Sequence, residues 1–549
     1  RAVRADGAVV DVALVHRRLS IIDHGGGAQP MLSQRADGTP RAPSVSERVV
    51  APGFRPLVFL GRPDAPVHYE PLPDVTDTVA VVFNGCIYNH RRLRSELQAL
   101  GHTFASDHSD TEVLLHGWRE WKERLGEHLD GMFGLALWER RNGTLAMFRD
   151  RFGEKPLHLM HVHRGGAWLN VFSSVPMAGG PLAAAIGESD VPVRPLSTWR
   201  HWLRFGWSVD QPVKGAGVLQ PGLGMVYSPD GLPLQEGAPT PRLYRFGLPN
   251  DWVRSRDLNA DETERLLSDA VRERLEADVP LGCFLSGGVD SSLVALMALR
   301  HAGRLQTFTV RMPDPVYDEA VFAEEAARHL GCDHTTLECV AKPAEDLVRL
   351  IQQIGQPFGD SSLLPAYWVS RAASRHVKVA LSGDGGDELF AGYERYTEIP
   401  WWALTAPGLS TLGLRLTRAA GPKSIRSKMA RLLDAAAHDG YGDVISIFPY
   451  SMLRELVING AAVEQERFPS YARGFSAQSA IHFDLLNYLP EDLMRKTDSA
   501  SMAVALEVRA PFLDLQLSNA ATNATLGSLM PHNQRKGLLR QVARRHLPA

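Results

Sequence analysis

The sequence predicts two domains: an N-terminal α+β domain built on antiparallel strands, and a C-terminal α/β domain with a parallel, doubly wound sheet. Its 549 residues exceed what one hydrophobic core usually organises. Short apolar runs separated by glycine and proline extend from Val9 to Tyr244, whereas strands alternate with helices after Leu258. We place the boundary between residues 250 and 251, where Leu248–Asp251 supplies turn residues.

The N-terminal half shows the pattern of antiparallel strands. The expected strands are Val9–Val15, Val79–Phe83, Gly134–Trp138, Leu145–Phe148 and Trp168–Phe172. Helical periodicity interrupts them at Arg91–Gly101 and Asp110–Leu125. Residues Ser33–Asp77 are rich in proline and charge, so we interpret them as a surface insertion in this domain.

The C-terminal half alternates strands and helices. The expected strands are Gly282–Leu285, Gln306–Val310 and Val377–Leu381. The expected helices are Ala260–Leu275, a segment that starts at Ser291, and Glu319–Leu330. From Tyr393 onward the pattern is mainly helical. This alternation predicts a parallel sheet whose strands present their carboxyl-end loops at one edge.

Composition argues against several classes of partner. The net charge of −3 gives no electrostatic basis for binding nucleic acid or an anionic membrane. No apolar run reaches the roughly 20 residues that span a bilayer. The four cysteines form no C-x-x-C pair, so we expect reduced thiols in a cytoplasmic protein. His329, Cys332 and His334 lack a second ligand pair, and we expect packing roles for them rather than a metal site.

The strongest local signal is Ser286-Gly-Gly-Val-Asp-Ser-Ser292, between a predicted strand and a predicted helix. Its two glycines let backbone N–H groups approach phosphate oxygens, and its serine hydroxyls add donors. The N-terminus of the following helix is itself an anion site. No lysine follows, which distinguishes the loop from G-x-x-x-x-G-K-[ST]. The alternative is an ordinary turn capped by Asp290 or Ser291.

A second glycine loop, Ser382-Gly-Asp-Gly-Gly-Asp-Glu388, follows the strand predicted at Val377–Leu381. Three acidic side chains beside glycines, at the carboxyl end of a strand, predict a magnesium site. For this loop taken alone, an exposed D-G turn is the alternative. Because both loops follow strands of one predicted parallel sheet, we expect them to converge on the same crevice.

Several further motifs occur in the same chain, and together with the two loops they resemble the asparagine synthetase family. They are His16–Asp23, Asn84–Asn89, Arg149–Pro156, Asp498–Met502 and Glu507–Asp514. The resemblance covers nearly the whole chain apart from Ser33–Asp77. The S-G-G-x-D-S pattern also resembles the pyrophosphate loop of ATP pyrophosphatases, which split ATP between its α- and β-phosphates.

The resemblance implies an αββα glutaminase sandwich of the N-terminal-nucleophile type, followed by a parallel-sheet ATP pyrophosphatase domain with extra helices. In the family, glutamine hydrolysis supplies ammonia through an internal tunnel to the second domain. There the side-chain carboxylate of aspartate attacks the α-phosphate of Mg-ATP, which gives β-aspartyl-AMP and pyrophosphate. Ammonia then displaces AMP and leaves asparagine. The implied partners are aspartate, glutamine or ammonia, with no nucleic acid or membrane, and a homodimer is left open.

Matching this sequence to the family's motifs assigns candidate residues of the ATP site. The implied ATP-binding residues are Leu285, Ser286, Gly287, Gly288, Asp290, Ser291, Ser292, Val310, Ser382 and Gly383. Asp290 and Asp387 match the magnesium-binding acids, and Lys536 matches a lysine that stabilises charge on the reacting phosphate. Asp384, where the family often has glutamate, completes the implied catalytic set with Asp387 and Lys536.

The implied glutamine-binding residues are Arg18, Asn84, Gly85 and Asp110. Asn84 and Gly85 match the oxyanion donors. Family glutaminases begin with a nucleophilic cysteine, whereas residue one here is Arg1, so we expect a sequence that lacks part of both ends. Cys86 stands where the family usually has glutamate. Since Cys86 has no free α-amine, we expect a packing or pocket-lining thiol rather than a replacement nucleophile.

Two other functions stay open at this point. A related enzyme could adenylate another carboxylate, as β-lactam synthetases and lasso-peptide cyclases do. Those relatives tend to lack a working glutaminase, whereas this chain keeps Arg18, Asn84 and Asp110. A protein that only binds nucleotide is the alternative from another class. Pyrophosphate release separates them: the ligase requires aspartate, the cyclase ignores it, and the binding protein releases none.

Deleting Ser33–Pro66 is expected to leave ammonia-dependent synthesis nearly unchanged. This part of the insertion is rich in proline, which denies a sheet its N–H donors, so an exposed connection is expected. The free energy of closing a loop changes by only about 0.6 kcal/mol per doubling of loop length, so the domain should stay folded after the deletion. Pyrophosphate release with ammonia as the nitrogen source measures the outcome. Its abolition in a folded deletion variant would place the segment in the ATP site.

Overall fold

The computed structural model describes residues 2–3, 9–10, 21–22, 31–33, 40–41, 78–164, 167–175, 200–208, 216–227, 241–248, 254–312, 318–338, 341–398, 435, 440–448, 452–453 and 476–547. The chain divides into two compact units. The N-terminal unit comprises residues 1–193, 211–248 and 276–280, and the C-terminal unit comprises residues 194–210, 249–275 and 281–549. The boundary predicted between residues 250 and 251 lies close to the change of unit after Leu248, and it stays a prediction.

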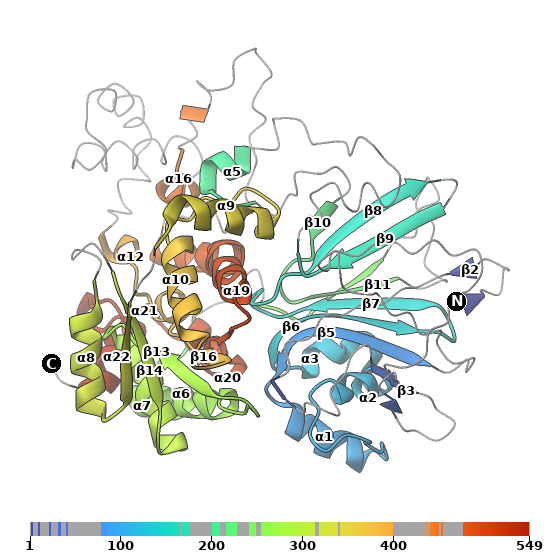
Figure 1. Cartoon of the computed structure of the whole chain (residues 1–549), viewed down its shortest axis with the longest axis horizontal. Helices are drawn as coiled ribbons and strands as arrows, with labels where there is room; N and C mark the ends of the chain where they lie inside the picture. Colours follow the sequence, from blue (N-terminus) through green and yellow to red (C-terminus); the bar gives the residue numbers. More distant parts are fainter. Residues whose placement is uncertain are drawn as a thin grey trace. The chain divides into compact units, whose positions relative to one another are not determined.

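The N-terminal unit is built on antiparallel sheets (Figure 1). Seven strands form the order β12-β11-β7-β6-β5-β3-β4, three form β10-β8-β9, and β1 pairs with β2. The strands are β1 (Ala2–Val3), β2 (Val9–Val10), β3 (Met31–Ser33), β4 (Pro40–Arg41), β5 (Val79–Ile87), β6 (Gly131–Glu139), β7 (Thr144–Arg149), β8 (His158–Arg164), β9 (Ala167–Ser173), β10 (Ala216–Val218), β11 (Leu223–Tyr227) and β12 (Arg242–Arg245).

Both faces of the seven-stranded sheet are covered, because alternate side chains of each strand enter different cores. On β5, Val81 and Phe83 pack into the core shared with the helices, whereas Val82 packs into a second core with Leu159 of β8. The helical layer consists of α1 (His90–Ala99), α2 (Glu112–Trp121), η1 (Lys122–Arg124) and α3 (Leu125–His128). This double burial explains why β5, β6 and β7 have nearly continuous apolar sequences instead of alternating ones.

The C-terminal unit contains a five-stranded sheet in which every pairing is parallel, in the order β15-β14-β13-β16-β17. Its strands are β13 (Leu281–Phe284), β14 (Gln306–Arg311), β15 (Asp333–Glu338), β16 (Val379–Leu381) and β17 (Glu507–Arg509). The helices before β17 are α5 (Arg200–Phe205), α6 (Ala260–Arg274), α7 (Val289–Ala302), α8 (Ala320–Leu330), α9 (Pro343–Ile354), α10 (Leu363–Ala373), α11 (Gly386–Leu389), α12 (Glu394–Glu398), α16 (Tyr441–Ile445), α18 (Ala477–Phe483), the π-helical η5 (Asp484–Met494) and α19 (Arg495–Met502). After β17 follow η6 (Pro511–Leu513), α20 (Leu515–Asn523), α21 (Leu526–Leu529), η7 (Pro531–Asn533) and α22 (Gly537–Ala543).

Local sequence explains where the helices around this sheet begin and end. The Asn259 side chain accepts a hydrogen bond from Glu262 N (2.9 Å) and so caps the start of α6. Helix α7 ends at Gly303, whose φ of +70° is left-handed and favours glycine. The two expected strands before residue 311 and the helices α6, α7 and α8 lie where the pattern placed them, within one or two residues at most ends. None of the described helices is long and apolar enough to span a membrane.

The strand order reverses at the middle of this sheet. Strand β13 has β14 on one side and β16 on the other, although β14 and β15 come between them in sequence. Such a topological switch point opens a crevice outside the carboxyl ends of the two central strands. The loops that follow β13 and β16 are the two glycine loops.

Candidate active site

The two glycine loops are in direct contact at the switch point. A methyl group at Gly383 would lie 3.0 Å from Asp290 Cβ, and one at Gly386 would lie 2.5 Å from Asp290 Oδ2. Both positions therefore need glycine, because any side chain there would push the second loop away from Asp290. The convergence predicted for the two loops is confirmed.

Hydrogen bonds between its own serines hold the first loop, and the N-terminal end of α7 is left uncapped. Ser291 Oγ lies 3.0 Å from Ser286 Oγ and accepts a hydrogen bond from Ser286 N (3.2 Å). Helix α7 begins after Gly288, and no side chain caps it. Ser291 therefore closes the turn, as the alternative expected, but it does not cap the start of α7. Ser292 Oγ is buried and has no hydrogen-bond partner among the described residues. An uncapped helix start beside such a hydroxyl fits a bound phosphate.

Lys536 bridges the two loops. Its Nζ lies 2.5 Å from Asp290 Oδ2 and 2.8 Å from Asp387 Oδ1. It thus comes from a third segment, just before α22, to meet the two acids predicted as metal ligands. Lys536 has a φ of +51°, which is left-handed and costs about 1–3 kcal/mol for a residue other than glycine. Such backbone strain is concentrated at functional sites.

Burial sets the electrostatics of this cluster. Burial raises the pKa of Asp290 to about 6, although the Lys536 ammonium acts in the opposite direction. Burial would lower the pKa of Lys536, but the attraction of Asp290 and Asp387 outweighs it and the pKa of this ammonium is raised. Asp290 Oδ1 is buried without a hydrogen-bond partner in the described part of the chain. Two carboxylates with an unused buried oxygen are a donor set that suits Mg²⁺.

The second loop divides its three acids among different partners. Only Asp387 reaches Lys536. Asp384 Oδ2 accepts from Ser382 Oγ (2.9 Å) and Thr497 Oγ1 (3.3 Å). Glu388 is buried and accepts a hydrogen bond from the Tyr393 hydroxyl, and burial raises its pKa to about 8.

The other predicted nucleotide residues lie at the same edge of the sheet. Leu285 and Val310 are buried at the carboxyl ends of the neighbouring strands β13 and β14, where they are placed to border a base. Ser382 follows β16, and its N–H donates to Arg509 O (2.9 Å). Their roles as ATP contacts stay predictions.

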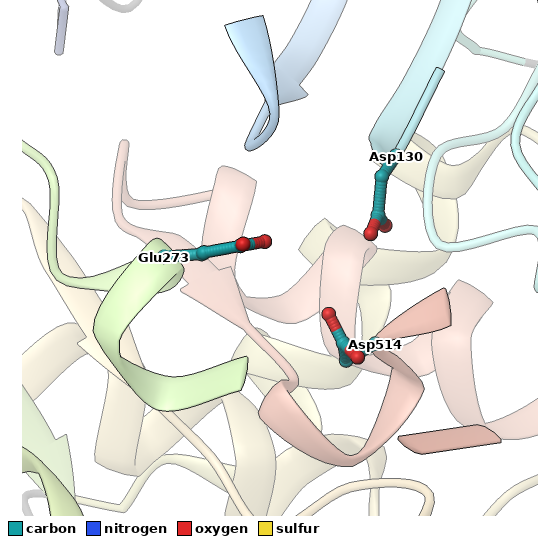
Figure 2. A group of neighbouring side chains, drawn as sticks. All are labelled: Asp130, Glu273 and Asp514. Atoms are coloured by element: carbon teal, nitrogen blue, oxygen red, sulfur yellow. The ribbon is translucent and has the colours of Figure 1, made fainter. Parts of the chain in front are cut away.

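Two motifs that carried the resemblance have structural roles. In Glu507–Asp514, Glu507 accepts from Arg509 Nε (2.9 Å), and the Asp514 side chain caps α20 through Gln516 N and Leu517 N. Figure 2 shows Asp514 with Glu273 of α6, whose pKa is raised by burial and by the Asp514 charge. In Arg149–Pro156, the buried Asp150 carboxylate accepts four backbone N–H groups, from Phe133, Phe152, Glu154 and Lys155.

His329 and His334 do not converge on a common ligand. His329 Nε2 lies 2.9 Å from His546 O, and His334 Nδ1 lies 2.9 Å from Thr307 Oγ1. Cys332 is a free cysteine. This geometry agrees with the packing roles expected for the H-L-G-C-D-H segment.

In the N-terminal unit, three of the four predicted glutamine residues are described. Asn84 and Gly85 lie on β5, and the Asp110 carboxylate accepts a hydrogen bond from Ile87 N (3.3 Å) on the same strand. Cys86 is buried, which fits the expected packing role. Arg18 lies outside the described residues. Three of the four predicted residues are therefore either part of strand β5 or hydrogen-bonded to it.

Gly85→Ala is expected to destabilise the N-terminal unit by about 2–5 kcal/mol. Gly85 has a φ of +142°, and a methyl group there would lie 1.9 Å from Met132 O on the paired strand β6. Backbone strain and overpacking each cost about 1–3 kcal/mol. Chemical denaturation measures the loss. Gly217→Ala, which meets nothing within 4 Å, is the control. Equal stability of the two variants would contradict the close approach of β5 and β6.

The fold and the site together define an α/β domain with two glycine loops that meet at the switch point of its parallel sheet, joined to an antiparallel unit. Residues 262–549 match the family model described as asparagine synthase, and residues 64–178 match a glutamine amidotransferase domain. The second match begins inside the predicted insertion. The chain therefore belongs to the asparagine synthase family. The predicted fold class, a glutaminase sandwich followed by a parallel-sheet synthetase domain, is confirmed.

The similar proteins are named as asparagine synthetases, and the alignments cover most of their length. Asparagine synthetase [glutamine-hydrolyzing] 1 of Bacillus subtilis is 30% identical over 513 residues, which is 90% of this chain and 77% of that protein. A putative asparagine synthetase [glutamine-hydrolyzing] of Mycobacterium tuberculosis is 31% identical over 520 residues, which is 90% of this chain and 76% of that protein. Asparagine synthetase [glutamine-hydrolyzing] 3 of Bacillus subtilis is 28% identical over 569 residues, 97% of this chain and 77% of that protein.

Proposed function

We propose that this chain is an ATP-dependent ligase that makes asparagine from aspartate, with ammonia supplied by glutamine hydrolysis. The reaction passes through β-aspartyl-AMP and releases pyrophosphate and AMP. One observation carries the proposal: in a member of the asparagine synthase family, Lys536 lies between Asp290 and Asp387 at the switch point of the parallel sheet. We propose that the reaction takes place in the cytoplasm, where ATP and aspartate are available.

The chain's own groups account for the adenylation step. The backbone N–H groups of residues 286–290 and the Ser292 hydroxyl hold the phosphates, while Leu285 and Val310 border the adenine. Lys536 neutralises the negative charge that grows as the aspartate carboxylate attacks the α-phosphate. Asp290 and Asp387 would hold Mg²⁺, which supplies further charge neutralisation on the phosphates. The low exposure of Lys536 and Asp290, 15% and 12%, limits competition from water.

The N-terminal unit is proposed to supply ammonia. Asn84 and Gly85 on β5 would stabilise the oxyanion that forms at the glutamine amide. Asp110, anchored to the same strand through Ile87 N, would bind the α-amine of glutamine, and Arg18 its carboxylate. The released nitrogen would have to reach the second site as uncharged ammonia, because ammonium has no lone pair and is not a nucleophile.

Pyrophosphate release tests the proposal. With Mg-ATP and ammonia, aspartate is expected to raise pyrophosphate release by at least tenfold, with asparagine and AMP appearing in equal amounts. Release that does not depend on aspartate would favour a synthetase for another carboxylate. The absence of release under all conditions would favour a protein that only binds nucleotide.

A further inference from the structure

A nearly buried ion pair lies in the C-terminal unit beside the second glycine loop. Lys496 Nζ on α19 is 2.9 Å from Asp360 Oδ2 and donates to Ser362 Oγ (2.7 Å). The two charged side chains are only 12% and 13% exposed. Asp360 and Ser362 precede α10, which packs against α19 (Figure 1). An ammonium has three donors, so one N–H of Lys496 is left over in the described structure.

A second acid completes this cluster. Asp492 of η5 is 7% exposed, and its Oδ1 has no hydrogen-bond partner in the described structure. Burial and the nearby Asp360 charge raise the pKa of Asp492 to about 7. The Lys496 and Arg495 charges lower this pKa, but the Arg495 guanidinium also pairs with Glu491 and donates to Ser208 O (3.1 Å), so its charge is shared between two acids. The cluster of Asp360, Asp492 and Lys496 thus contains one carboxylate more than it contains cations.

The cluster is connected to the second glycine loop. Thr497, the residue after Lys496, donates from its Oγ1 to Asp384 Oδ2 (3.3 Å), and Asp384 also accepts from Ser382 Oγ. Tyr488, one turn before Asp492, has a raised pKa because it is buried and near the charges of Asp492, Asp360 and Glu388. A small ligand at Asp492 would therefore lie beside the loop that faces the nucleotide.

The charges and the unused hydrogen-bonding groups of the cluster indicate which kind of ligand it can bind. The surplus carboxylate and its unused oxygen favour a cationic group on the ligand. Its remaining N–H favours a carboxylate on the same ligand. A zwitterionic amino-acid head group has both charges.

We propose that Asp492, together with Asp360, binds the α-ammonium of the amino-acid substrate, while Lys496 faces its α-carboxylate. This inference rests on the proposed function and extends it, because it identifies the pocket that selects an α-amino acid. The distal carboxylate of the bound aspartate then points toward the nucleotide loops. These residues were missed in the sequence because Asp360 lies more than a hundred residues before Asp492 and Lys496, and none of the three belongs to a glycine loop.

The test compares three carboxylic acids with the wild type and Asp492→Asn. Aspartate has both head-group charges, succinate lacks the ammonium, and β-alanine lacks the α-carboxylate but keeps the amine. Asp492→Asn is expected to lower kcat/KM for aspartate by about 10- to 100-fold, which is the range for a lost hydrogen bond to a charged group. Succinate turnover and the KM for ATP should change less than threefold. Asp492→Glu keeps the charge and should recover part of the preference for aspartate over succinate.

Asp484→Asn is the matched control. Asp484 is equally buried in η5, but its carboxylate accepts from Tyr396, Tyr441 and Arg395. This variant should alter stability without changing the ratio of aspartate to succinate turnover. An equal fall for aspartate and succinate in Asp492→Asn would show a structural role and overturn the pocket. So would an unchanged KM for aspartate.

Calorimetry separates this proposal from the proposed function. If the wild type releases no pyrophosphate with aspartate, the proposed function fails. The pocket then stands only if the protein binds aspartate directly and Asp492→Asn weakens that binding at least tenfold. Failure of the wild type to bind aspartate would overturn the pocket as well.

Discussion

Lys536→Ala is expected to reduce aspartate-dependent pyrophosphate release by about 10²–10³-fold. The ammonium is preorganised between Asp290 and Asp387, at 2.5 and 2.8 Å, and it comes from a strained backbone position. Removing it leaves two carboxylates facing each other where negative charge must accumulate on the α-phosphate. The assay uses Mg-ATP, aspartate and ammonia, so that it does not depend on glutamine hydrolysis.

The neighbouring arginine provides the control for this variant. Arg535 carries the same charge one residue earlier, but it pairs with Glu394 at the surface (3.1 Å, side chains 41% and 63% exposed). Surface pairs of this kind contribute about 0–1 kcal/mol, so Arg535→Ala should keep activity within about twofold of the wild type. Equal activity of the two variants would remove Lys536 from the site.

Gly392→Ala is expected to lower the same activity by about 100-fold while the protein stays folded. A methyl group at Gly392 would lie 2.0 Å from Asp387 Oδ1 and 2.2 Å from Lys536 Cε. Both neighbours are ends of side chains rather than backbone, so the fold can accommodate the methyl group by displacing them. A displacement of about 1 Å at a catalytic group can cost about 10² in rate.

This prediction separates positioning from stability. The free energy of unfolding of Gly392→Ala should lie within about 1 kcal/mol of the wild type, because no backbone contact is broken. Gly527→Ala in α21 is the control, since a methyl group there meets nothing within 4 Å. Full activity in Gly392→Ala would show that Asp387 and Lys536 can relax without loss of function. Unfolding of the variant would show that the contact is part of the core.

The glycine loops illustrate how far local sequence could be interpreted. Their composition predicted strand–loop–helix junctions, and β13, β16 and the uncapped α7 occur where expected. Their convergence followed from the rule that parallel strands present their carboxyl ends at one edge. Strand β15, which the pattern missed, has a polar sequence, Asp-His-Thr-Thr-Leu-Glu, because it is an edge strand with a largely exposed face.

Strand β17 was missed for a different reason. Its three residues, Glu507–Arg509, are too short to show a period, and they enter the sheet only because β16 offers a free edge. Inside the C-terminal unit, Arg509 Nε then donates a hydrogen bond to Glu507 Oε1 (2.9 Å). Pairing between segments that are more than a hundred residues apart has no signature in either segment alone.

The sequence by itself indicated the two kinds of sheet and the residue types of the phosphate loops, because these depend on short-range periodicity and on glycine positions. Its motifs, taken together, carried the resemblance to the family. Tertiary structure alone showed which acids of the second loop reach Lys536. Asp387 turns toward Lys536 whereas Glu388, the next residue, is buried against Tyr393. It also brought Asp360 and Asp492 together, more than a hundred residues apart, beside Lys496. The side-chain direction and burial that separate a ligand from a structural acid arise only when distant segments pack.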